Sequence, residues 1–303
     1  MKTITIIGGS GFVGKTFIDS FNKKKTLKSK IKKLFIICRN PNKLKKNKEL
    51  NFKKVKLIKG DISKLKVLPI TDLYIYAAET TKISAYNNKK NIINSHKKAI
   101  DNFCALAEKQ HLNNILYLSS GAATRKKKDN NSKYKKIYSK LKAYSENKIK
   151  DLSKHNLKTS IARCYTFIGK WLPKKSHYAV ENFISDGLYE KEIYVKSSNK
   201  VIRSYMYADD LISWLIKIAT HSDKNCPIYN VGSNEQIELR KLAIKIAKIF
   251  NKPIKFAKLK NKKIDIYVPN IDKVKRKLNL KINYNLNESI KLTIKERLNE
   301  KIN

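Results

Sequence analysis

The 303-residue sequence is poor in cysteine and contains no long hydrophobic segment. Its four cysteines, Cys38, Cys104, Cys164 and Cys226, lie far apart and form no C-x-x-C pair, which disfavours a metal site and a disulfide framework. No apolar run reaches the roughly 18 residues that a membrane-spanning helix needs. The opening stretch MKTITIIGGSG breaks at glycine after a short apolar run, which is typical of a strand and not of a signal peptide. We therefore expect a cytoplasmic protein with reduced thiols, no bound metal and no membrane partner.

Acidic residues are also scarce: the chain has 24 Asp and Glu and 68 Lys and Arg. Such an excess fits a nucleic-acid binder, which gains from counterion release, or a surface on which lysine is the default polar residue. The lysines are spread over nearly every expected helix and loop, and no zinc-finger or RNP-type motif accompanies them. We therefore favour a solvated surface and expect no specific nucleic-acid partner. The basic field still attracts anionic ligands, including nucleotides.

Short β-branched runs alternate with helical patterns along the first half of the chain, which predicts βαβ units and a parallel sheet. The fold class is accordingly α/β, a Rossmann-type doubly wound sheet. Beyond about residue 170 the alternation loosens, and no glycine/serine linker marks a boundary. The expected strands cover 2–9, 33–40, 53–61, 71–79, 113–121, 158–169, 191–196 and 227–233, and the expected helices cover 14–24, 91–109, 138–155, 179–189 and 239–250, with 201–220 passing from strand to helix and a lysine-rich tail at the end.

Glycine is rare, with nine residues in the chain, yet four of them fall in the stretch GGSGFVG between the first strand and the first helix. Glycines there permit a tight turn and a close backbone approach, and the helix N-terminus that follows receives a pyrophosphate. We therefore predict a dinucleotide-binding loop. The residues expected to contact the cofactor are Gly8, Gly11, Phe12, Val13 and Gly14.

The residue after the second strand bears on the choice between NAD and NADP. An NAD site usually has an acid there for the ribose hydroxyls, but this strand ends IICRN, with Arg39 and no acid. Arginine pairs well with phosphate, so Arg39 favours NADP over NAD, the alternative being an ordinary surface cation. Asp61 and Ile62, after the third strand, are candidates for the adenine edge, although Asp61 also suits a helix N-cap.

A Tyr-x-x-x-Lys spacing places a phenol and an ammonium one turn apart on a helix, where the cation favours the phenolate and the pair can transfer protons near neutral pH. In a chain rich in both residues the spacing also arises by chance, so context must choose. The spacing occurs three times, in Tyr86 with Lys90, Tyr138 with Lys142, and Tyr144 with Lys148. The pair Tyr138 and Lys142 follows a strand that ends in two serines, Ser119 and Ser120, at the edge of the sheet where ligands bind.

These motifs together resemble the extended short-chain dehydrogenases/reductases, the family of NAD(P)-dependent nucleotide-sugar epimerases and dehydratases. The resemblance covers nearly the whole chain. It rests on the segments GGSGFVG, GDIS, DLYIYAAE, LYLSSGA, YSKLKAYSE, IARCYTFIG, IRSYMYADDL and IYNVGS.

The resemblance implies a role for each matching residue. Tyr138 would be the acid/base on a sugar hydroxyl or ketone, Lys142 would lower the pKa of that phenol and hold the nicotinamide ribose, and Ser120 would bond the reacting oxygen and the substrate. Arg203 would bind the substrate pyrophosphate, unless it is a surface arginine, and Thr166 stands where many relatives have a substrate-binding Asn. The remaining implied cofactor contacts are Ala77 and Ala78, which suit tight packing equally well.

Residues 1–167 are expected to form the NAD(P)-binding Rossmann domain, to which segments near 201–232 return, and 168–303 mainly a smaller, interleaved substrate-binding lobe. The resemblance also implies a homodimer formed by the helices at 91–109 and 138–150.

Departures from the family pattern bear on the reaction. Gly121 and Ala122 follow Ser120 where the 4,6-dehydratases carry an Asp-Glu pair, so dehydration is disfavoured. Leu141 and His96 replace a usual serine and a usual asparagine. We expect an epimerase or oxidoreductase acting on a nucleotide-activated sugar. The alternatives are a ketosugar reductase or 4,6-dehydratase-like enzyme and, in another class, a catalytically silent NADP(H)-binding regulatory protein.

Overall fold

The computed structural model describes residues 2–79, 86–124, 132–174, 178–260 and 264–302. The chain forms two compact units. The first comprises residues 1–164 and 212–230, and the second comprises 165–211 and 231–303.

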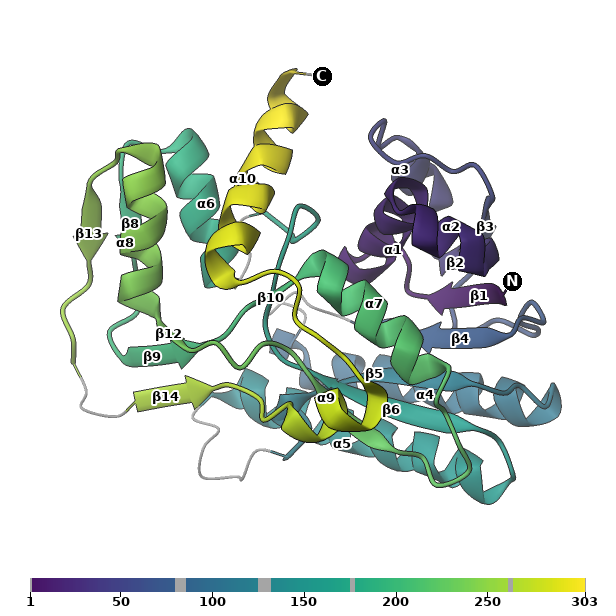
Figure 1. The fold of residues 1–303 in the computed structure, drawn as a ribbon. Helices are drawn as coiled ribbons and strands as arrows, with labels where there is room; N and C mark the ends of the chain where they lie inside the picture. Colours follow the sequence, from purple (N-terminus) through teal and green to yellow (C-terminus); the bar gives the residue numbers. More distant parts are fainter. Residues whose placement is uncertain (1, 80–85, 125–131, 175–177, 261–263, 303) are drawn as a thin grey trace. The chain divides into compact units, whose positions relative to one another are not determined.

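The first unit is built on a seven-stranded sheet (Figure 1). The pairings of β1 with β2 and β4, of β2 with β3, and of β5 with β4 and β6 are all parallel. The strand order reverses direction between β1 and β4, which makes this a doubly wound sheet with a switch point at that place, and the predicted Rossmann-type fold class is confirmed. In spatial order the strands are β11 (Ile228–Val231), β6 (Thr159–Cys164), β5 (Ile115–Ser120), β4 (Leu73–Tyr76), β1 (Lys2–Ile7), β2 (Ile31–Cys38) and β3 (Val55–Lys59).

Helices cover both faces of this sheet because each right-handed crossover places its helix according to the direction of the step. α4 (Lys89–Lys109) and α5 (Lys133–Lys154) pack together on one face, and α1 (Phe12–Lys23) lies on the other (Figure 1). Buried aromatic and aliphatic side chains such as Tyr76 and Phe103 fill the layer between the sheet and α4. The remaining short helices of this unit are α2 (Lys25–Lys30) and α3 (Pro41–Lys45).

Side-chain caps begin both long helices. Asn88 accepts a hydrogen bond from the Asn91 amide at the start of α4, and Ser132 accepts one from the Lys135 amide at the start of α5. The expected helix at 138–155 therefore starts five residues earlier than the sequence pattern indicated, at Lys133.

The second unit contains three small sheets and the last helices. Its strands are β7 (Phe167–Ile168), β8 (Ile193–Val195), β9 (Lys200–Arg203), β10 (Met206–Tyr207), β12 (Ile237–Glu238), β13 (Ile254–Phe256) and β14 (Ile264–Tyr267). Its helices are α6 (Ala179–Tyr189), α8 (Leu239–Phe250), α9 (Asp272–Leu278) and α10 (Leu286–Ile302), while α7 (Ala208–Ala219) spans both units.

The lysine-rich tail was expected without defined elements, but it contains β13, β14, α9 and the 17-residue helix α10. Among the described residues, no helix is long and apolar enough to cross a membrane.

Candidate active site

The glycine-rich loop connects β1 to α1 at the switch point of the sheet. Gly8 adopts a φ of +90°, and a Cβ added there would lie 2.4 Å from the Ala78 Cα, so only glycine fits against the end of β4. A Cβ on Gly14 would lie 2.2 Å from the carbonyl oxygen of Gly9, so the close approach of the loop to α1 requires glycine at this position. The loop backbone is thus pressed against Ala77 and Ala78, as tight packing requires.

Gly11 differs from these glycines because its side faces open space. The nearest atom that an added Cβ would meet is the Gly8 carbonyl oxygen, at 3.7 Å. Gly11 is also the N-cap of α1 and offers no side chain to the amides of the first turn, which begins with Phe12 and Val13 and holds no acid. A glycine face with no clash, at a helix N-terminus whose N-cap residue has no side chain, fits the diphosphate of a dinucleotide.

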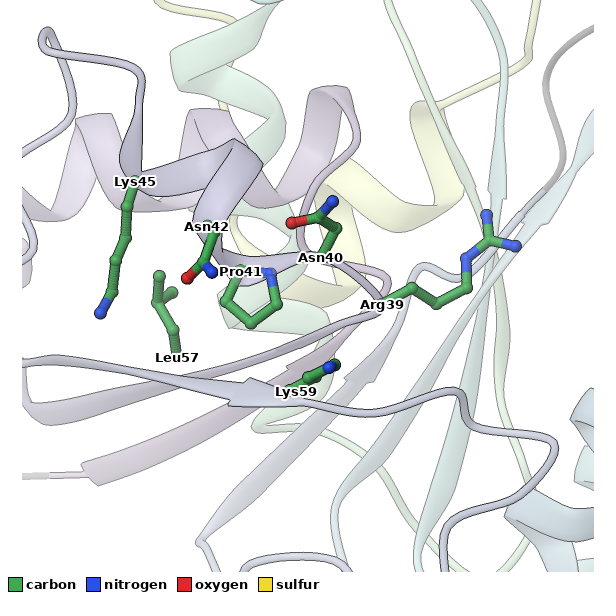
Figure 2. A pocket seen from close by; sticks show the side chains of 7 residues that line it. All are labelled: Arg39, Asn40, Pro41, Asn42, Lys45, Leu57 and Lys59. Atoms are coloured by element: carbon green, nitrogen blue, oxygen red, sulfur yellow. The ribbon is translucent and has the colours of Figure 1, made fainter.

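Arg39 follows β2 and lines a pocket of about 560 Å³ that is rich in basic and amide side chains (Figure 2). Lys45 and Lys59 line the same pocket, so three cations surround it, and Figure 2 shows the Arg39 side chain extending away from that of Lys45. Asn40 uses its side-chain oxygen to cap α3 by accepting from the Lys43 amide at 3.0 Å. The pocket offers an anionic ligand a strongly positive environment.

Asp61 follows β3. Its Oδ1 accepts hydrogen bonds from the amide (3.0 Å) and the hydroxyl (2.8 Å) of Ser63, and its carbonyl accepts from the Lys64 and Leu65 amides, so it begins the turn that contains Ile62. Burial raises the pKa of Asp61, but the bonds from Ser63 and the charge of Arg39 outweigh this and lower it. Asp61 is therefore an anion near Arg39, with a capping role of its own.

The two serines at the end of β5 have different partners. Ser119 is buried and donates to Glu146 Oε1 at 2.6 Å, and the same carboxylate receives two hydrogen bonds from Arg163, at 2.9 and 2.6 Å. Ser120 Oγ instead accepts the Ala122 amide at 3.2 Å. Ser119 therefore belongs to a structural triad between β5, α5 and β6, and Ser120 is the better candidate for contact with a substrate.

Tyr138 is half-buried on α5, in a cluster of aromatic rings. Its ring centroid lies 5.8 Å from that of Tyr134, 6.4 Å from that of Tyr86, and 5.7 Å from the Lys142 ammonium. The spacing therefore does bring this phenol and this ammonium to one face of α5, the next α-helix after Ser120 in the chain.

The other two Tyr-x-x-x-Lys pairs have different surroundings. Tyr86 is buried, and its burial and the charge of Glu79 raise its pKa, while Lys90 is exposed. Tyr144 bonds Asp101, and burial together with that carboxylate raises its pKa to about 12. Neither pair favours a phenolate near neutral pH.

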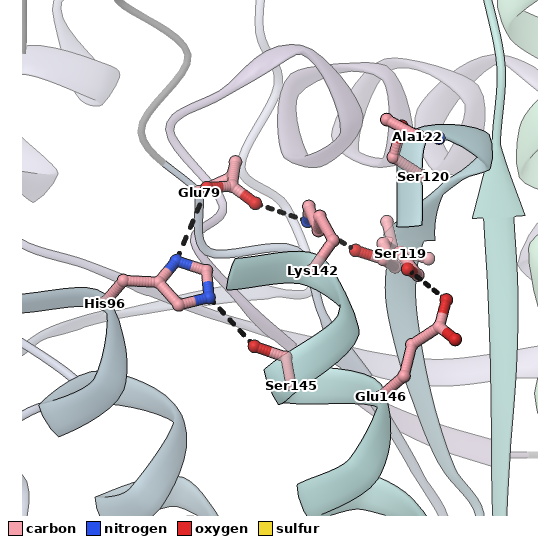
Figure 3. Close-up of polar contacts among 9 residues, drawn as sticks. Glu79, His96, Ser119, Ser120, Ala122, Lys142, Ser145 and Glu146 are labelled. Carbon is pink, nitrogen blue, oxygen red and sulfur yellow. Dashed lines mark hydrogen bonds and ion pairs between the residues drawn. The ribbon is translucent and has the colours of Figure 1, made fainter. Parts of the chain in front are cut away.

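Lys142 is 4% exposed in its side chain and binds a carboxylate that the sequence analysis did not single out (Figure 3). Its Nζ forms an ion pair with Glu79 Oε2 and donates to the Leu118 carbonyl at 2.9 Å. Burial lowers the pKa of Lys142, but the charge and hydrogen bond of Glu79, together with Tyr117 and Tyr138, outweigh that effect and hold the pKa well above its ordinary value. Lys142 is therefore an ammonium.

The two residues that the family resemblance assigns to the substrate lie in the second unit. Thr166 donates through its hydroxyl to the Ser204 carbonyl. Arg203 forms an ion pair with Asp265 Oδ2 at 2.8 Å and donates to the Asp265 carbonyl at 2.7 Å, with its guanidinium 5.9 Å from the Tyr267 ring centroid. An anionic substrate group would meet Arg203 beside a carboxylate that already balances its charge.

Comparison with known protein families assigns the chain to one of them. The model of the NAD dependent epimerase/dehydratase family matches residues 4–232, which span β1 to β11 and include the glycine-rich loop and Tyr138. The chain belongs to this family. No curated protein sequence matches it significantly.

Solved structures share the fold over the whole chain. A UDP-N-acetylglucosamine 4-epimerase from Methanobrevibacter ruminantium, in complex with UDP-N-acetylmuramic acid, is 17% identical with a TM-score of 0.82, over 99% of both chains. The UDP-glucose 4-epimerase of Thermotoga maritima, with UDP-glucose, is 15% identical with a TM-score of 0.80, over 99% of this chain and 100% of that one. A dTDP-glucose 4,6-dehydratase from Bacillus anthracis, in complex with NAD, is 15% identical with a TM-score of 0.77, over 100% and 98%.

Across the described residues of this epimerase-family chain, no group of His, Cys, Asp and Glu side chains is arranged to hold a metal ion. Sequence reasoning missed Glu79 and Arg163 as site residues, and it missed the contacts that His96 makes with Glu79 and that Glu146, a match to the family's helix motif, makes with Ser119 and Arg163. One signal was available for Glu79, because it follows a parallel strand at the edge where ligands bind, as Ser120 does.

Proposed function

We propose that the protein is an NAD(P)-dependent enzyme that epimerises, oxidises or reduces a nucleotide-activated sugar, with Ser120, Tyr138 and Lys142 as its catalytic residues. The observation that carries the proposal is the buried, charged Lys142 beneath the half-buried phenol of Tyr138 in a chain of the epimerase/dehydratase family. Structural neighbours of the same fold are described in complex with UDP-sugars and NAD, which supports this substrate class.

In this mechanism Tyr138 acts as the acid/base. The Lys142 ammonium favours the phenolate, which removes the proton from a sugar hydroxyl while that carbon is oxidised, and the phenol returns a proton when the carbonyl is reduced. Ser120 donates a hydrogen bond to the reacting oxygen. The nicotinamide supplies hydride acceptance and donation when it is bound. The Gly11 face and the N-terminus of α1 would hold its diphosphate, and Lys142 would hold the adjoining ribose.

The sugar product and the oxidation state of the cofactor after the reaction distinguish an epimerase, a reductase and a dehydratase. An epimerase leaves the cofactor in the oxidation state in which it started, whereas a ketosugar reductase consumes the reduced form. Gly121 and Ala122 carry no carboxylate beside Ser120 to assist loss of water, so we place dehydration behind both. Incubation with a panel of UDP- and dTDP-sugars, followed by NMR of the products and absorbance of the cofactor, distinguishes all three reactions.

We further propose that the enzyme prefers NADP over NAD. The support is the position of Arg39 after β2, where no acid is present for the ribose hydroxyls, and the two lysines that share its pocket. Neighbouring structures are described with NAD, so binding of both cofactors must be compared directly. An affinity for NAD equal to or above that for NADP would remove the role given to Arg39.

The silent-protein alternative and the oligomeric state have their own tests. Protein that binds NADP(H) and converts no nucleotide sugar would be a regulatory binder. We also propose a homodimer formed by α4 and α5, on the family resemblance, and a molecular mass of one chain in solution, 35.1 kDa, would contradict it.

A further inference from the structure

Glu79, at the end of β4, has no part in the proton transfers proposed above, yet it is in direct contact with the lysine that they need. We propose that Glu79 is a positioning residue whose carboxylate, held by His96, orients the Lys142 ammonium and offsets its charge at Tyr138. The inference rests on the proposed function, since it concerns the same site. It assigns to Glu79 and His96 the control of the acid/base.

The first support is the burial of the pair. The side chain of Lys142 is 4% exposed and that of Glu79 is 13% exposed, and a buried ammonium requires a compensating partner. Leu118 supplies a carbonyl at 2.9 Å, and the negative charge comes from Glu79, which forms an ion pair with Nζ. Burial raises the pKa of Glu79, yet Lys142 and His96 lower it to about 2, so the carboxylate is ionised at neutral pH.

The second support is the contact on the far side of the carboxylate (Figure 3). His96 Nδ1 lies 3.6 Å from Glu79 Oε1, and His96 Nε2 lies 2.8 Å from the hydroxyl of Ser145. Lys142 and Ser145 sit one turn apart on α5, so the contacts of Lys142 with Glu79, of Glu79 with His96 and of His96 with Ser145 form a ring that the backbone of α5 closes. The ring restricts Glu79 from both ends and thereby restricts Lys142.

The third support is the effect of the pair on nearby phenols. The charge of Glu79 raises the pKa of Tyr117 and of Tyr86, and the charge of Lys142 lowers both. The Tyr138 ring lies 5.7 Å from the same ammonium, so it experiences a cation that a carboxylate partly cancels. The titratable groups around Glu79 are Lys142 on α5, His96 on α4, Tyr76 on β4, Tyr117 on β5, and Tyr86.

The test is Glu79→Gln, which keeps the shape of the side chain and removes its charge. In this variant the Tyr138 phenolate takes the place of Glu79 as the counter-ion of the buried ammonium, so ionisation of Tyr138 shifts to lower pH by about one pH unit. The tyrosinate difference spectrum, taken between each protein and its Tyr138→Phe counterpart, isolates this phenol and needs no turnover. The same shift appears in the acidic limb of the pH–rate profile, and Glu79→Asp returns part of it.

The matched control is Asp101→Asn. Asp101 is also a carboxylate between α4 and α5, where it bonds Tyr144 and Lys148 away from Lys142. We expect the control to keep the wild-type midpoint of Tyr138. An unchanged midpoint in Glu79→Gln, or an equal shift in Asp101→Asn, would overturn the proposal. A shift in Glu79→Gln together with no conversion of any nucleotide sugar by the wild type would leave it standing and remove the proposed function instead.

A second variant covers the case in which Glu79→Gln fails to fold. The double variant Glu79→Gln/Lys142→Met removes both buried charges, whereas Lys142→Met alone leaves the carboxylate buried without its partner, so we expect the double variant to melt at a higher temperature than Lys142→Met. A double variant that melts at or below the temperature of Lys142→Met would show that the two side chains are not coupled, and the inference would fail.

Discussion

The phenol of Tyr144 donates to both carboxylate oxygens of Asp101, at 2.7 and 3.0 Å. This contact gives Tyr144 different surroundings from Tyr138, which lies six positions earlier on the same helix. Tyr144 points to α4 and has its pKa raised to about 12, whereas Tyr138 lies over the charged Lys142. One helix therefore carries the copy of the motif that we propose to be catalytic and a copy whose phenol is bound to Asp101, and the second copy serves as an internal control.

We predict that Tyr138→Phe lowers kcat by about 10²- to 10⁴-fold, because the phenolic proton route is lost while the ring packing stays. Tyr144→Phe removes only the bonds to Asp101 and should keep kcat within about twofold of the wild type. Steady-state kinetics with the best nucleotide sugar checks both variants. Equal losses in the two variants would mean that the site has been misplaced.

Arg39→Ser tests the cofactor preference. A charge-assisted hydrogen bond to phosphate contributes about 1.5–3 kcal/mol, so the variant should bind NADPH about 10- to 100-fold more weakly and NADH almost unchanged. Fluorescence titration with each reduced cofactor measures the two dissociation constants. Lys43→Ser, at an exposed lysine of α3 that does not line the pocket, is the control. A parallel loss for both cofactors would argue against a contact with the extra phosphate.

The ion pair of Glu79 and Lys142 predicts a pH-dependent stability. Lys142→Met leaves the carboxylate buried without its partner and should cost about 3 kcal/mol at pH 7. The pKa of Glu79 is lowered from 4.5 to about 2 in the folded protein, so the stability that the ionised pair contributes is complete above 4.5 and is lost as the pH falls towards 2.

Urea unfolding of the wild type and Lys142→Met at a series of pH values therefore gives curves that converge in acid. A difference that stays constant from pH 7 down to pH 3 would contradict the assignment of an ionised Glu79.

The ion pair of Glu181 and Arg297, in the second unit, predicts a stability that changes with pH in the opposite direction. Glu181 is 1% exposed and lies 2.9 Å from Arg297, and burial outweighs the arginine charge to raise its pKa from 4.5 to about 7. Because the folded state holds this proton more tightly, the stability is complete below 4.5 and declines as the pH rises to 7.

Glu181→Gln should flatten that decline by on the order of 2 kcal/mol, whereas Glu190→Gln, at an exposed acid after the same helix, should leave it unchanged. Calorimetry between pH 4 and pH 8 checks both variants. A wild-type curve that does not fall over this range would contradict the raised pKa.

Local sequence signals predicted the strand before the glycine-rich loop and the helix that packs against α5, the helix of Tyr138. The β-branched run before GGSGFVG, and the apolar stripe of the helix at 91–109, depend on residues close together in the chain, and both elements form at nearly the expected positions. The helix α10 was missed although it has a local signal, a capping box in which Asn285 and Glu288 exchange hydrogen bonds with one another's amides.

The contacts around Lys142 could not be predicted from local sequence signals, because they join residues far apart in the chain. Glu79, His96 and Ser145 come from three elements, and only the packing of α4 against α5 beside β4 brings their side chains together. His96 stands where members of the resembled family usually have an asparagine. Its contact with Glu79 gives that replacement a structural reason.

The most direct test of the account is product analysis by NMR after the wild type and Tyr138→Phe, each shown to bind NADP(H), are incubated with a panel of UDP- and dTDP-sugars. The account predicts that the wild type converts at least one of them to an epimer, a ketosugar or a reduced sugar, and that Tyr138→Phe forms less than about 1% as much in the same time. Conversion by Tyr138→Phe at close to the wild-type rate would contradict it.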